Sequence, residues 1–165
     1  MDLMDEGLLD FWRALNKNSV VYIMVGGFAV NLNGYIRATK DSDLWLKDDL
    51  TNRRNFRKAY AESGYGDFAS LETMQFAPGW TQFYIANGII LDIMTSMKGL
   101  ENKTFDECYQ QARVADLDGV RVPFLHINDL LANKKAVARP KDQLDVIELE
   151  KIKKYLNEKD SEKKG

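Results

Sequence analysis

The chain has 165 residues, of which 45% are hydrophobic and 29% are charged, so it can bury one ordinary core, and collagen-like, disulfide-framework and largely disordered proteins are excluded. Its formal net charge of -2 lacks the basic excess of proteins that grip long nucleic acid, which argues against a processive polymerase. Its single cysteine excludes an internal disulfide and a cysteine-based metal site.

The N-terminal residues and the apolar runs bear on location. Asp2, Asp5 and Glu6 stand near the start, and no basic region followed by a long apolar stretch is present, so we expect no signal peptide. The longest apolar run, over 20–25, is far too short to cross a bilayer. We therefore expect a cytoplasmic protein without a membrane partner.

Helical and strand-like segments alternate in the N-terminal half. Leu8, Phe11, Trp12 and Leu15 fall on one stripe at helical spacing, which predicts an amphipathic first helix. The predicted elements, in chain order, are a helix over 4–15, a buried strand over 19–25, a short helix over 28–33, a strand over 37–46, and a helix capped by Asp49 or Thr51 that ends at Ser63.

Turn signals organise the C-terminal half. The predicted elements are two strands over 81–86 and 89–95 joined by an Asn87-Gly88 hairpin, a helix opened by a capping box at Thr104 and Glu107, a weaker hairpin at Asp118-Gly119, a helix from Asn128 to about 138, a break at Pro140, and a helix over 141–156. We therefore predict an α+β fold with a mixed sheet flanked by helices. Residues 1–127 form its core, and 128–165 form a helical extension packed on that core within a single structural domain.

Two aspartates stand close together in the second predicted strand. Asp41 and Asp43 are two residues apart, so their side chains leave the same face. Two carboxylates that face one way repel each other unless a positive charge separates them. A divalent cation would accept oxygen ligands from both. A solvent-facing strand edge is the alternative, because Asp-x-Asp is common by chance.

A third aspartate interrupts an apolar run. Asp92 lies within 88–94, which otherwise looks like a central strand. An unpaired buried carboxylate costs several kcal/mol, so Asp92 needs a partner or a metal. A buried salt bridge to Arg37 or Arg113 is one alternative. The other is a two-metal phosphoryl-transfer site, which needs a third acid on a neighbouring strand.

A glycine pair follows the first predicted strand. Gly26-Gly27 stands where that strand runs into a helix, and exposed backbone N–H groups there form a cradle for phosphate. The pair is neither a dinucleotide fingerprint nor a P-loop, because the further glycines and the Lys-Ser/Thr are missing. A plain tight turn is the alternative.

Together these motifs resemble the DNA polymerase beta-like nucleotidyltransferase superfamily. The resemblance rests on Val25-Gly26-Gly27, on the segment from Arg37 to Leu44 and on Asp92, and it covers residues 22 to about 149. The residue pattern of the Asp-x-Asp segment looks most like that of small prokaryotic members of the superfamily, including the AbiEii-type toxins and the antibiotic nucleotidyltransferases. Residues 130–145 also resemble the family's C-terminal Lys…Arg-x-Lys-Asp-x-x-Asp helices.

The chain departs from the family pattern at two positions. Gly27 stands where many members have a serine whose hydroxyl can hold a phosphate. Ser42 stands between the two acids where an apolar residue is common. Neither departure removes a metal ligand.

The resemblance implies a mixed sheet flanked by helices and a nucleoside triphosphate bound with two Mg²⁺ ions, for which Mn²⁺ is an alternative. Asp41 and Asp43 would bind both ions, and Asp92 would bind one ion and take the proton of the acceptor hydroxyl. Gly26 and Gly27 would hold the triphosphate. The reaction would be in-line attack on the α-phosphorus with pyrophosphate leaving.

Further cations are candidates for the nucleotide site. Lys134 or Lys135, with Arg139, would neutralise the outer phosphates, oriented by two acids at i, i+3 on the next helix, Asp142 and Asp145. An ordinary ion-pair network between helices is the alternative. Arg37 and Thr39 share the predicted strand face of Asp41 and would touch the nucleotide; otherwise Arg37 balances the acids.

The expected activity is transfer of a nucleoside monophosphate to a hydroxyl of a small molecule, a protein or an RNA end. The near-neutral charge favours the first two acceptors over RNA. The acceptor would bind between the protomers of a homodimer, or between the C-terminal helices and the sheet. A toxin–antitoxin component with the same chemistry and a non-catalytic nucleotide-binding protein are the alternatives.

Overall fold

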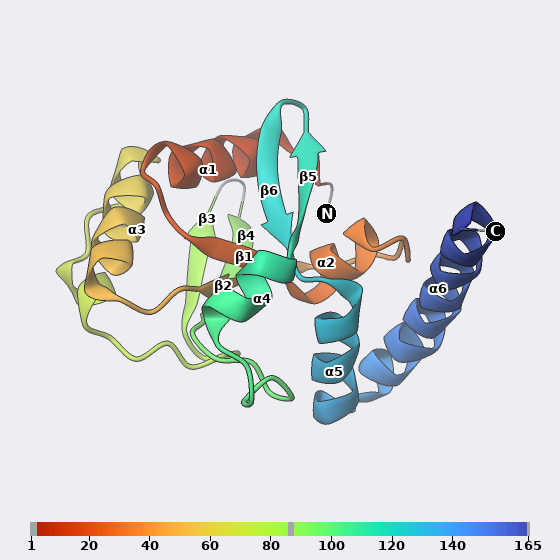
Figure 1. Ribbon diagram of the computed structural model, residues 1–165. Helices are drawn as coiled ribbons and strands as arrows, with labels where there is room; N and C mark the ends of the chain where they lie inside the picture. Colours follow the sequence, from red (N-terminus) through yellow and green to blue (C-terminus); the bar gives the residue numbers. More distant parts are fainter. Residues whose placement is uncertain (1–2, 86–87, 165) are drawn as a thin grey trace.

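The computed structural model describes residues 3–85 and 88–164, and six strands within them form one mixed sheet in the order β3-β4-β2-β1-β6-β5 (Figure 1). The strands are β1 Tyr22–Val25, β2 Asp41–Leu46, β3 Gln82–Ile85, β4 Ile89–Met94, β5 Arg113–Leu117 and β6 Val120–Phe124. The helices are α1 Glu6–Lys17, α2 Gly26–Leu32, α3 Leu50–Glu62, α4 Phe105–Gln111, α5 Ile127–Val137, α6 Pro140–Lys164 and a 3-10 turn, η1 Ala69–Glu72. The α+β prediction is confirmed.

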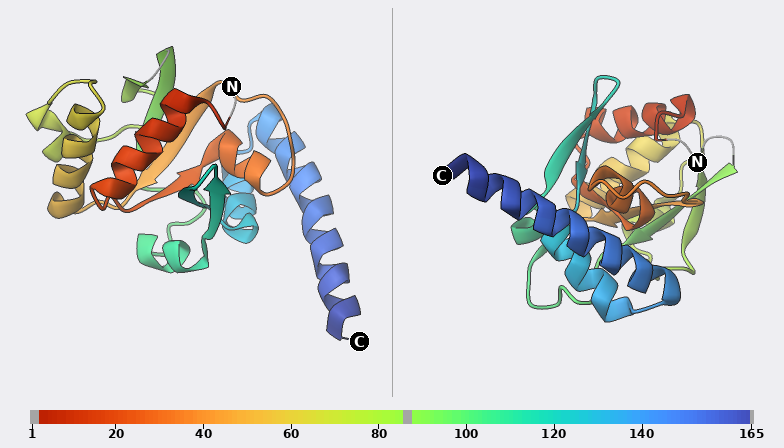
Figure 2. Two further views of the ribbon diagram at one scale, coloured as in Figure 1. Left: turned by 90° about the horizontal axis from the view of Figure 1, so that it is seen from above. Right: turned by 90° about the vertical axis from the view of Figure 1, so that its right-hand side faces the viewer.

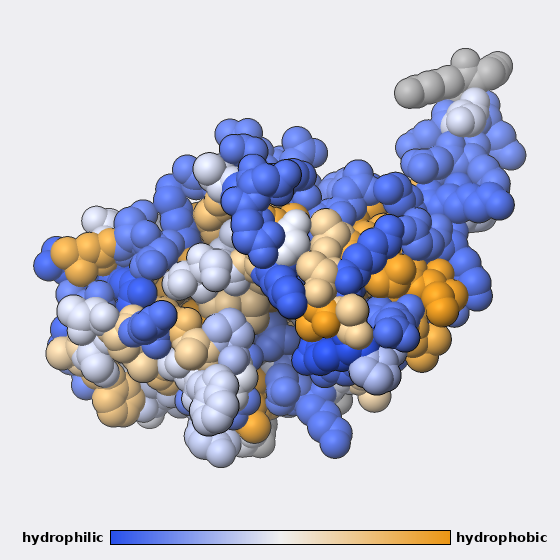
Figure 3. Space-filling view, turned by 90° about the horizontal axis from the view of Figure 1, so that it is seen from below, coloured by the Kyte–Doolittle hydropathy of each residue, from blue (hydrophilic) through white to orange (hydrophobic). Residues whose placement is uncertain are grey.

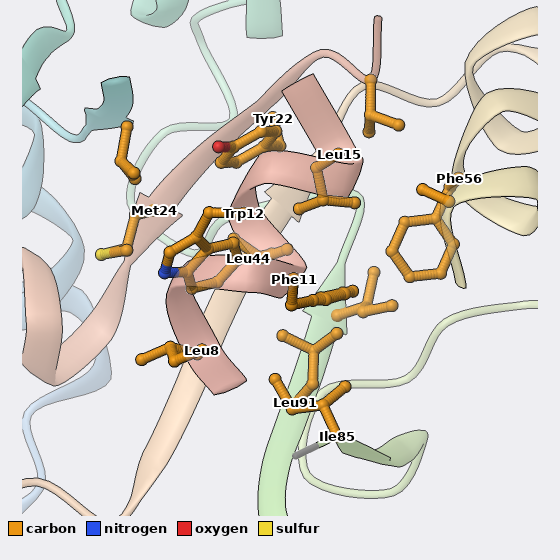
Figure 4. Packing of buried hydrophobic residues seen from close by; sticks show 14 of the residues in the cluster. Leu8, Phe11, Trp12, Leu15, Tyr22, Met24, Leu44, Phe56, Ile85 and Leu91 are labelled. Carbon is orange, nitrogen blue, oxygen red and sulfur yellow. The ribbon is translucent and has the colours of Figure 1, made fainter. Parts of the chain in front are cut away.

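One face of the sheet is covered by α1 and α3. The apolar stripe of α1 is fully buried and packs with Phe56 of α3 against Met24, Leu44 and Leu91 of the sheet (Figure 4). Asp5 caps the helix by accepting the Leu8 backbone N–H at 3.0 Å. The predicted first helix is therefore confirmed, and its burial fixes which way β1, β2 and β4 face.

The other face carries α2, α4, α5 and α6. Val25 and Trp45 of the sheet pack there with Leu130 of α5 and Leu149 of α6. α6 lies along α5 at its start, and its C-terminal part extends away from the rest of the chain (Figure 2). This face also bears the three aspartates, so the candidate site lies between the sheet and the C-terminal helices.

Strand pairing sets the acids side by side. β2 runs antiparallel to β1 and parallel to β4, with Val25 opposite Asp43 and Asp43 opposite Asp92. β3 continues the row antiparallel to β4, with Gln82 opposite Asp92. Residues directly opposite each other share a face. The row therefore runs Gln82–Asp92–Asp43–Val25 on one side of the sheet.

The strand predicted over 37–46 begins only at Asp41. The backbone N–H groups before it are used elsewhere: Arg37 donates to the Asn31 side chain at 3.1 Å, and Tyr35 donates to Val30 O at 3.2 Å. These bonds hold the segment against α2 and away from the sheet ladder. The inference that Arg37 and Thr39 share a strand face with Asp41 is therefore wrong.

Helix boundaries in the C-terminal half differ in three places. His126, not Asn128, caps α5, because its Nδ1 accepts the Asn128 backbone N–H at 3.1 Å. The predicted break at Pro140 is confirmed, because α5 ends at Val137 and a separate helix, α6, follows; α6 begins at Pro140 itself rather than at Lys141, in the first helical position, where the missing N–H costs nothing. α6 also continues past the predicted end at 156 to Lys164.

Both predicted hairpins are confirmed as strand pairs. β3 pairs antiparallel with β4, and β5 pairs antiparallel with β6. Asn87 of the first turn lies outside the described residues. Thr104 caps α4 by accepting the Glu107 N–H at 3.1 Å, as the capping box predicts.

The face of the molecule that Figure 3 draws is mainly polar. Seen from below, it is largely hydrophilic, and apolar groups gather towards the side from which the C-terminal helix extends (Figure 3). Over 3–85 and 88–164, no helix combines the length and the apolar character needed to cross a membrane.

Candidate active site

Asp43 and Asp92 form the centre of the candidate site. They are register partners on parallel β2 and β4, and both side chains are partly buried. Asp41 lies two residues earlier on the same face of β2, opposite Ile90. The structure thus brings the three predicted acids to one region of the sheet.

The charges of these acids oppose one another. Burial raises the pKa of Asp43 to about 6, and the nearby charges of Asp92 and Asp41 contribute to the rise, while Lys134 and Lys141 act in the opposite direction. Burial also raises the pKa of Asp92. Removing a proton from Asp43 or Asp92 therefore costs more than it does in water, which favours a bound cation.

Asp92 has one oxygen held and one left free. Its Oδ2 accepts the Gly79 backbone N–H at 2.9 Å, and its Oδ1 is buried without a hydrogen-bond partner among the described residues. The alternative reading of Asp92, a buried salt bridge to Arg37 or Arg113, is wrong, because Arg37 is bound to Asp145 and Arg113 lies on β5, at the opposite edge of the sheet.

The glycine pair is required by close packing against the site. Gly26 has a φ of +64°, and a Cβ there would lie 2.0 Å from Asp43 Oδ2. A Cβ on Gly27 would lie 2.3 Å from Thr39 Oγ1. Only glycine lets the start of α2 approach Asp43 and Thr39 this closely, so the pair forms an open backbone edge beside the acids.

A cavity of about 260 Å³ opens beside this edge and is rich in cations. It is lined by Gly26, Gly27, Arg37, Ala38, Thr39, Lys40, Asp41, Asp43, Lys134, Arg139 and Lys141. Five of these residues are Lys or Arg and two are Asp. We call it the basic cavity. It brings together residues from α2, β2, α5 and α6.

Two buried carboxylates of α6 fix the cations of the basic cavity. Lys134, with a side chain only 4% exposed, lies 3.0 Å from Asp142 Oδ1 and 3.2 Å from Asp145 Oδ2. Arg37 donates two hydrogen bonds to Asp145, at 2.7 and 2.8 Å. Arg139 donates to Asp142 at 2.6 Å. The predicted i, i+3 pair therefore contacts Lys134 and Arg139, as both a nucleotide site and an ordinary network of ion pairs would require.

The same contacts set the charge state of Asp142. Burial alone would raise its pKa, but hydrogen bonds from Arg139 and Lys134 outweigh burial and lower the pKa to about 2. Lys135 takes no part in this network. It pairs with Glu150 at 2.7 Å on a more exposed side of the helices, and the structure does not place it at the basic cavity.

Sequence comparison identifies the family. Residues 4–163 match the model of the family described as nucleotidyl transferase of unknown function (DUF2204). The chain belongs to this nucleotidyl transferase family. No protein with a curated description matches the sequence significantly.

Solved structures share the fold of this nucleotidyl transferase. The lincosamide antibiotic adenylyltransferase LnuA, solved with lincomycin bound, has a TM-score of 0.58 at 15% identity over 90% of this chain and 97% of that one. ANT(2″)-Ia, in complex with adenylyl-2″-tobramycin, has a TM-score of 0.53 at 16% identity over 87% and 89%. An antigenic nucleotidyltransferase-like protein from Paracoccidioides brasiliensis has a TM-score of 0.57 at 15% identity over 86% and 72%. At these identities the likeness concerns the fold.

The three acids of this nucleotidyl transferase offer only carboxylate oxygens as possible metal ligands. Among the residues described, no three His, Cys, Asp or Glu side chains converge into a ready metal cage. Asp92 Oδ1 nevertheless has no hydrogen-bond partner among the described residues, and the raised pKa of Asp43 shows that its negative charge is disfavoured at this position. Carboxylate oxygens are the ligands that Mg²⁺ takes. The donor set therefore suits Mg²⁺ or Mn²⁺.

Sequence reasoning missed two groups of the site. Gly79 holds Asp92 through its backbone N–H, a role for which the sequence carries no signal because it depends on a loop of 77–81 folding back onto β4. Lys141 lines the basic cavity. It stands within the Arg139-Pro-Lys141-Asp142 segment, so the family resemblance contained the signal.

Proposed function

We propose that this protein transfers a nucleoside monophosphate from a nucleoside triphosphate to a hydroxyl group. The observation that carries the proposal is the direct pairing of Asp43 with Asp92 beside the basic cavity. Membership of the nucleotidyl transferase family supports the reaction class.

The basic cavity would receive the triphosphate. Arg37, Lys134 and Arg139 bring positive charge to the open backbone edge at Gly26 and Gly27. Their positions are fixed by the buried acids of α6, so these cations need little reorganisation when charge builds on the leaving pyrophosphate.

Asp41, Asp43 and Asp92 would hold two Mg²⁺ ions, or Mn²⁺ ions. Bound there, the ions would supply charge neutralisation at the α-phosphate and the leaving group. Asp92 Oδ1 is the free oxygen that would accept the proton of the acceptor hydroxyl, while Gly79 keeps the other oxygen in place. The acceptor oxygen forms a bond to the α-phosphorus, the bond from that phosphorus to the bridging oxygen breaks, and pyrophosphate leaves.

The acceptor is proposed to be a small molecule or a protein, with an RNA end as the alternative. The formal net charge of -2 disfavours tight binding of a polyanion. LnuA was solved with lincomycin bound and ANT(2″)-Ia with adenylyl-2″-tobramycin, so two proteins of this fold bind small molecules.

Calorimetry with each of the four ribonucleoside triphosphates and Mg²⁺ tests nucleotide binding, and pyrophosphate release with a panel of hydroxyl acceptors, including lincomycin and tobramycin, tests transfer. We expect metal-dependent binding that Asp43→Asn abolishes. Asp92→Asn should retain binding and lower pyrophosphate release by about 10²–10⁴-fold.

Asp118→Asn is the matched control. Asp118 is an exposed acid in the turn between β5 and β6 with a φ of 54°, a conformation that asparagine tolerates well. It should leave binding and release unchanged. Failure of every nucleotide to bind the wild-type protein, or full activity of Asp92→Asn, contradicts the proposal.

A further inference from the structure

A second cavity meets the basic cavity at Asp43. Its volume is about 220 Å³, and four residues line both cavities: Gly26, Asp43, Lys134 and Arg139. The remaining lining is mainly apolar: Val25, Pro78, Met94, Met97 and Val137, with Ser96, Lys98 and Asn133. We call it the apolar cavity. Asp43 and Gly26 therefore stand between two cavities of opposite character.

This division matches the two ends of a nucleoside triphosphate. The phosphate chain is highly charged, whereas the base is flat and largely apolar on its faces. We propose that the apolar cavity binds the nucleobase, with Met94, Met97 and Val137 as its packing surface and Asn133 as the residue that reads its edge. The inference rests on the proposed function, because it assumes that the triphosphate enters the basic cavity.

The size of the apolar cavity suits a base. At about 220 Å³, the apolar cavity is smaller than the basic cavity of about 260 Å³ that would receive the triphosphate. Cavities for drug-sized ligands begin at about 300 Å³. By itself, the apolar cavity therefore lies below the usual volume of a site for a drug-sized acceptor.

The lining chemistry also suits a base. Met94 and Met97 bring polarizable thioethers, which make favourable contacts with aromatic rings. Met97 is held in the core packing of this face together with Leu130 and Leu131 of α5, so its position is fixed before a ligand arrives. A preformed apolar wall of this kind loses little side-chain entropy on binding.

Asn133 supplies hydrogen-bonding capacity at the wall. Its Nδ2 donates to the Lys98 carbonyl oxygen at 2.9 Å, which ties α5 to the 96–98 segment after β4 and orients the amide. The amide oxygen Oδ1 is an acceptor held in place by that bond. A fixed amide acceptor distinguishes bases by the groups on their edges.

Calorimetry in Mg²⁺ separates the two cavities by comparing inorganic triphosphate with the four ribonucleoside triphosphates. Inorganic triphosphate reports the basic cavity, and the gain on adding the nucleoside reports the apolar cavity. In the wild type, the preferred nucleotide should bind at least about tenfold more tightly than inorganic triphosphate. Val137→Phe fills the apolar cavity and should remove this gain while leaving the affinity for inorganic triphosphate within about threefold.

Three further variants complete the test. Val114→Phe makes the same change at a half-exposed position of β5 and should alter neither affinity. Asn133→Ala should change the order of preference among the four nucleotides. If the larger ring at 137 unfolds the chain, Met94→Ala, which removes one wall, should also reduce the nucleoside gain.

The outcomes distinguish this inference from the proposed function. Nucleotides that bind no more tightly than inorganic triphosphate overturn the nucleobase cavity and leave the transferase proposal standing. The nucleobase cavity is likewise overturned if Val137→Phe weakens the binding of inorganic triphosphate as much as it weakens the binding of nucleotides. It is also overturned if nucleotides still bind Val137→Phe and Met94→Ala more tightly than inorganic triphosphate by the full wild-type factor. Absence of binding by all five ligands overturns both the cavity and the transferase proposal.

Discussion

Asp43 and Asp92 lie directly opposite each other on the parallel strands β2 and β4, and the charge of Asp92 adds to the cost that burial imposes on the ionisation of Asp43. A parallel sheet normally buries apolar side chains on both faces, and here one register position holds two carboxylates instead. The pairing weakens the sheet when both are ionised. A divalent cation bound between the two carboxylates would remove this repulsion and stabilise the protein.

Asp43→Asn should stabilise the free protein at high pH. The pKa of Asp43 is raised from its ordinary value of 3.8 to about 6, so the folded state holds the proton more tightly than the unfolded chain. The contribution of this group to stability is therefore greatest below pH 4 and is lost as the pH rises through 6. In EDTA at pH 8, we expect the variant to gain about 1–3 kcal/mol in the free energy of unfolding.

Urea denaturation at pH 8 and pH 4 checks this prediction. The gain should vanish at pH 4, where the wild-type group is protonated, and Asp118→Asn should show no gain at either pH. At pH 8, added Mg²⁺ should stabilise only the wild type, so that the wild type becomes more stable than Asp43→Asn. A variant less stable than wild type at pH 8 in EDTA would show that Asp43 is already compensated.

Asp142→Asn should destabilise the protein near neutral pH. The pKa of Asp142 is lowered to about 2, so its contribution is present above the unfolded pKa near 4 and is lost as the pH falls towards 2. The substitution leaves Lys134 buried with one acid, at a cost of about 3 kcal/mol at pH 7. Urea denaturation of the wild type and of Asp142→Asn across pH 2–7 measures this loss of stability.

Lys135→Ala is the matched control for the buried network. Its partner Glu150 is 43% exposed, and pairs of this kind contribute about 0–1 kcal/mol. Equal losses for Asp142→Asn and Lys135→Ala would mean that the network of α5 and α6 adds no more than a surface pair.

Gly26→Ala should cost more than backbone strain explains. The new Cβ would meet Asp43 Oδ2 at 2.0 Å, in addition to the strain of a φ of +64°. Gly64 has a φ of +87° and nothing within 4 Å of its Cβ position, so Gly64→Ala measures strain alone, about 1 kcal/mol. We expect Gly26→Ala to lose at least about 2 kcal/mol and to weaken nucleotide binding. Thermal denaturation measures both variants. If Gly26→Ala and Gly64→Ala lose similar amounts of stability, close packing at the site is contradicted.

Arg139→Ala should weaken triphosphate binding, and Lys135→Ala should not. Arg139 lines the basic cavity and is held by Asp142, whereas Lys135 is turned towards Glu150. Loss of one charge-assisted contact should lower the affinity for inorganic triphosphate by about 10-fold, as measured by calorimetry with Mg²⁺. A weaker complex with Lys135→Ala would show that the second lysine reaches the ligand.

Local structure could be predicted where it depends on neighbours in the chain. The apolar stripe of α1, the Thr104 cap and the Asp118-Gly119 turn are short-range features, and each is confirmed. The prediction that Asn128 caps α5 was wrong because a capping residue can shift by one or two positions without changing the helical pattern. The early start of the second strand was wrong because Asn31 of α2 takes the Arg37 N–H.

The sequence by itself determined the residue types of the candidate site: three aspartates, a glycine pair and a run of cations, in an order typical of one family. Only the tertiary structure decided which of them meet. Strand register put Asp43 against Asp92, packing of α6 on α5 turned Lys134 inward and Lys135 outward, and the 77–81 loop brought Gly79 to Asp92. Spacing along a chain fixes which side of an element a residue occupies, but contact between distant elements depends on the packing of the whole core.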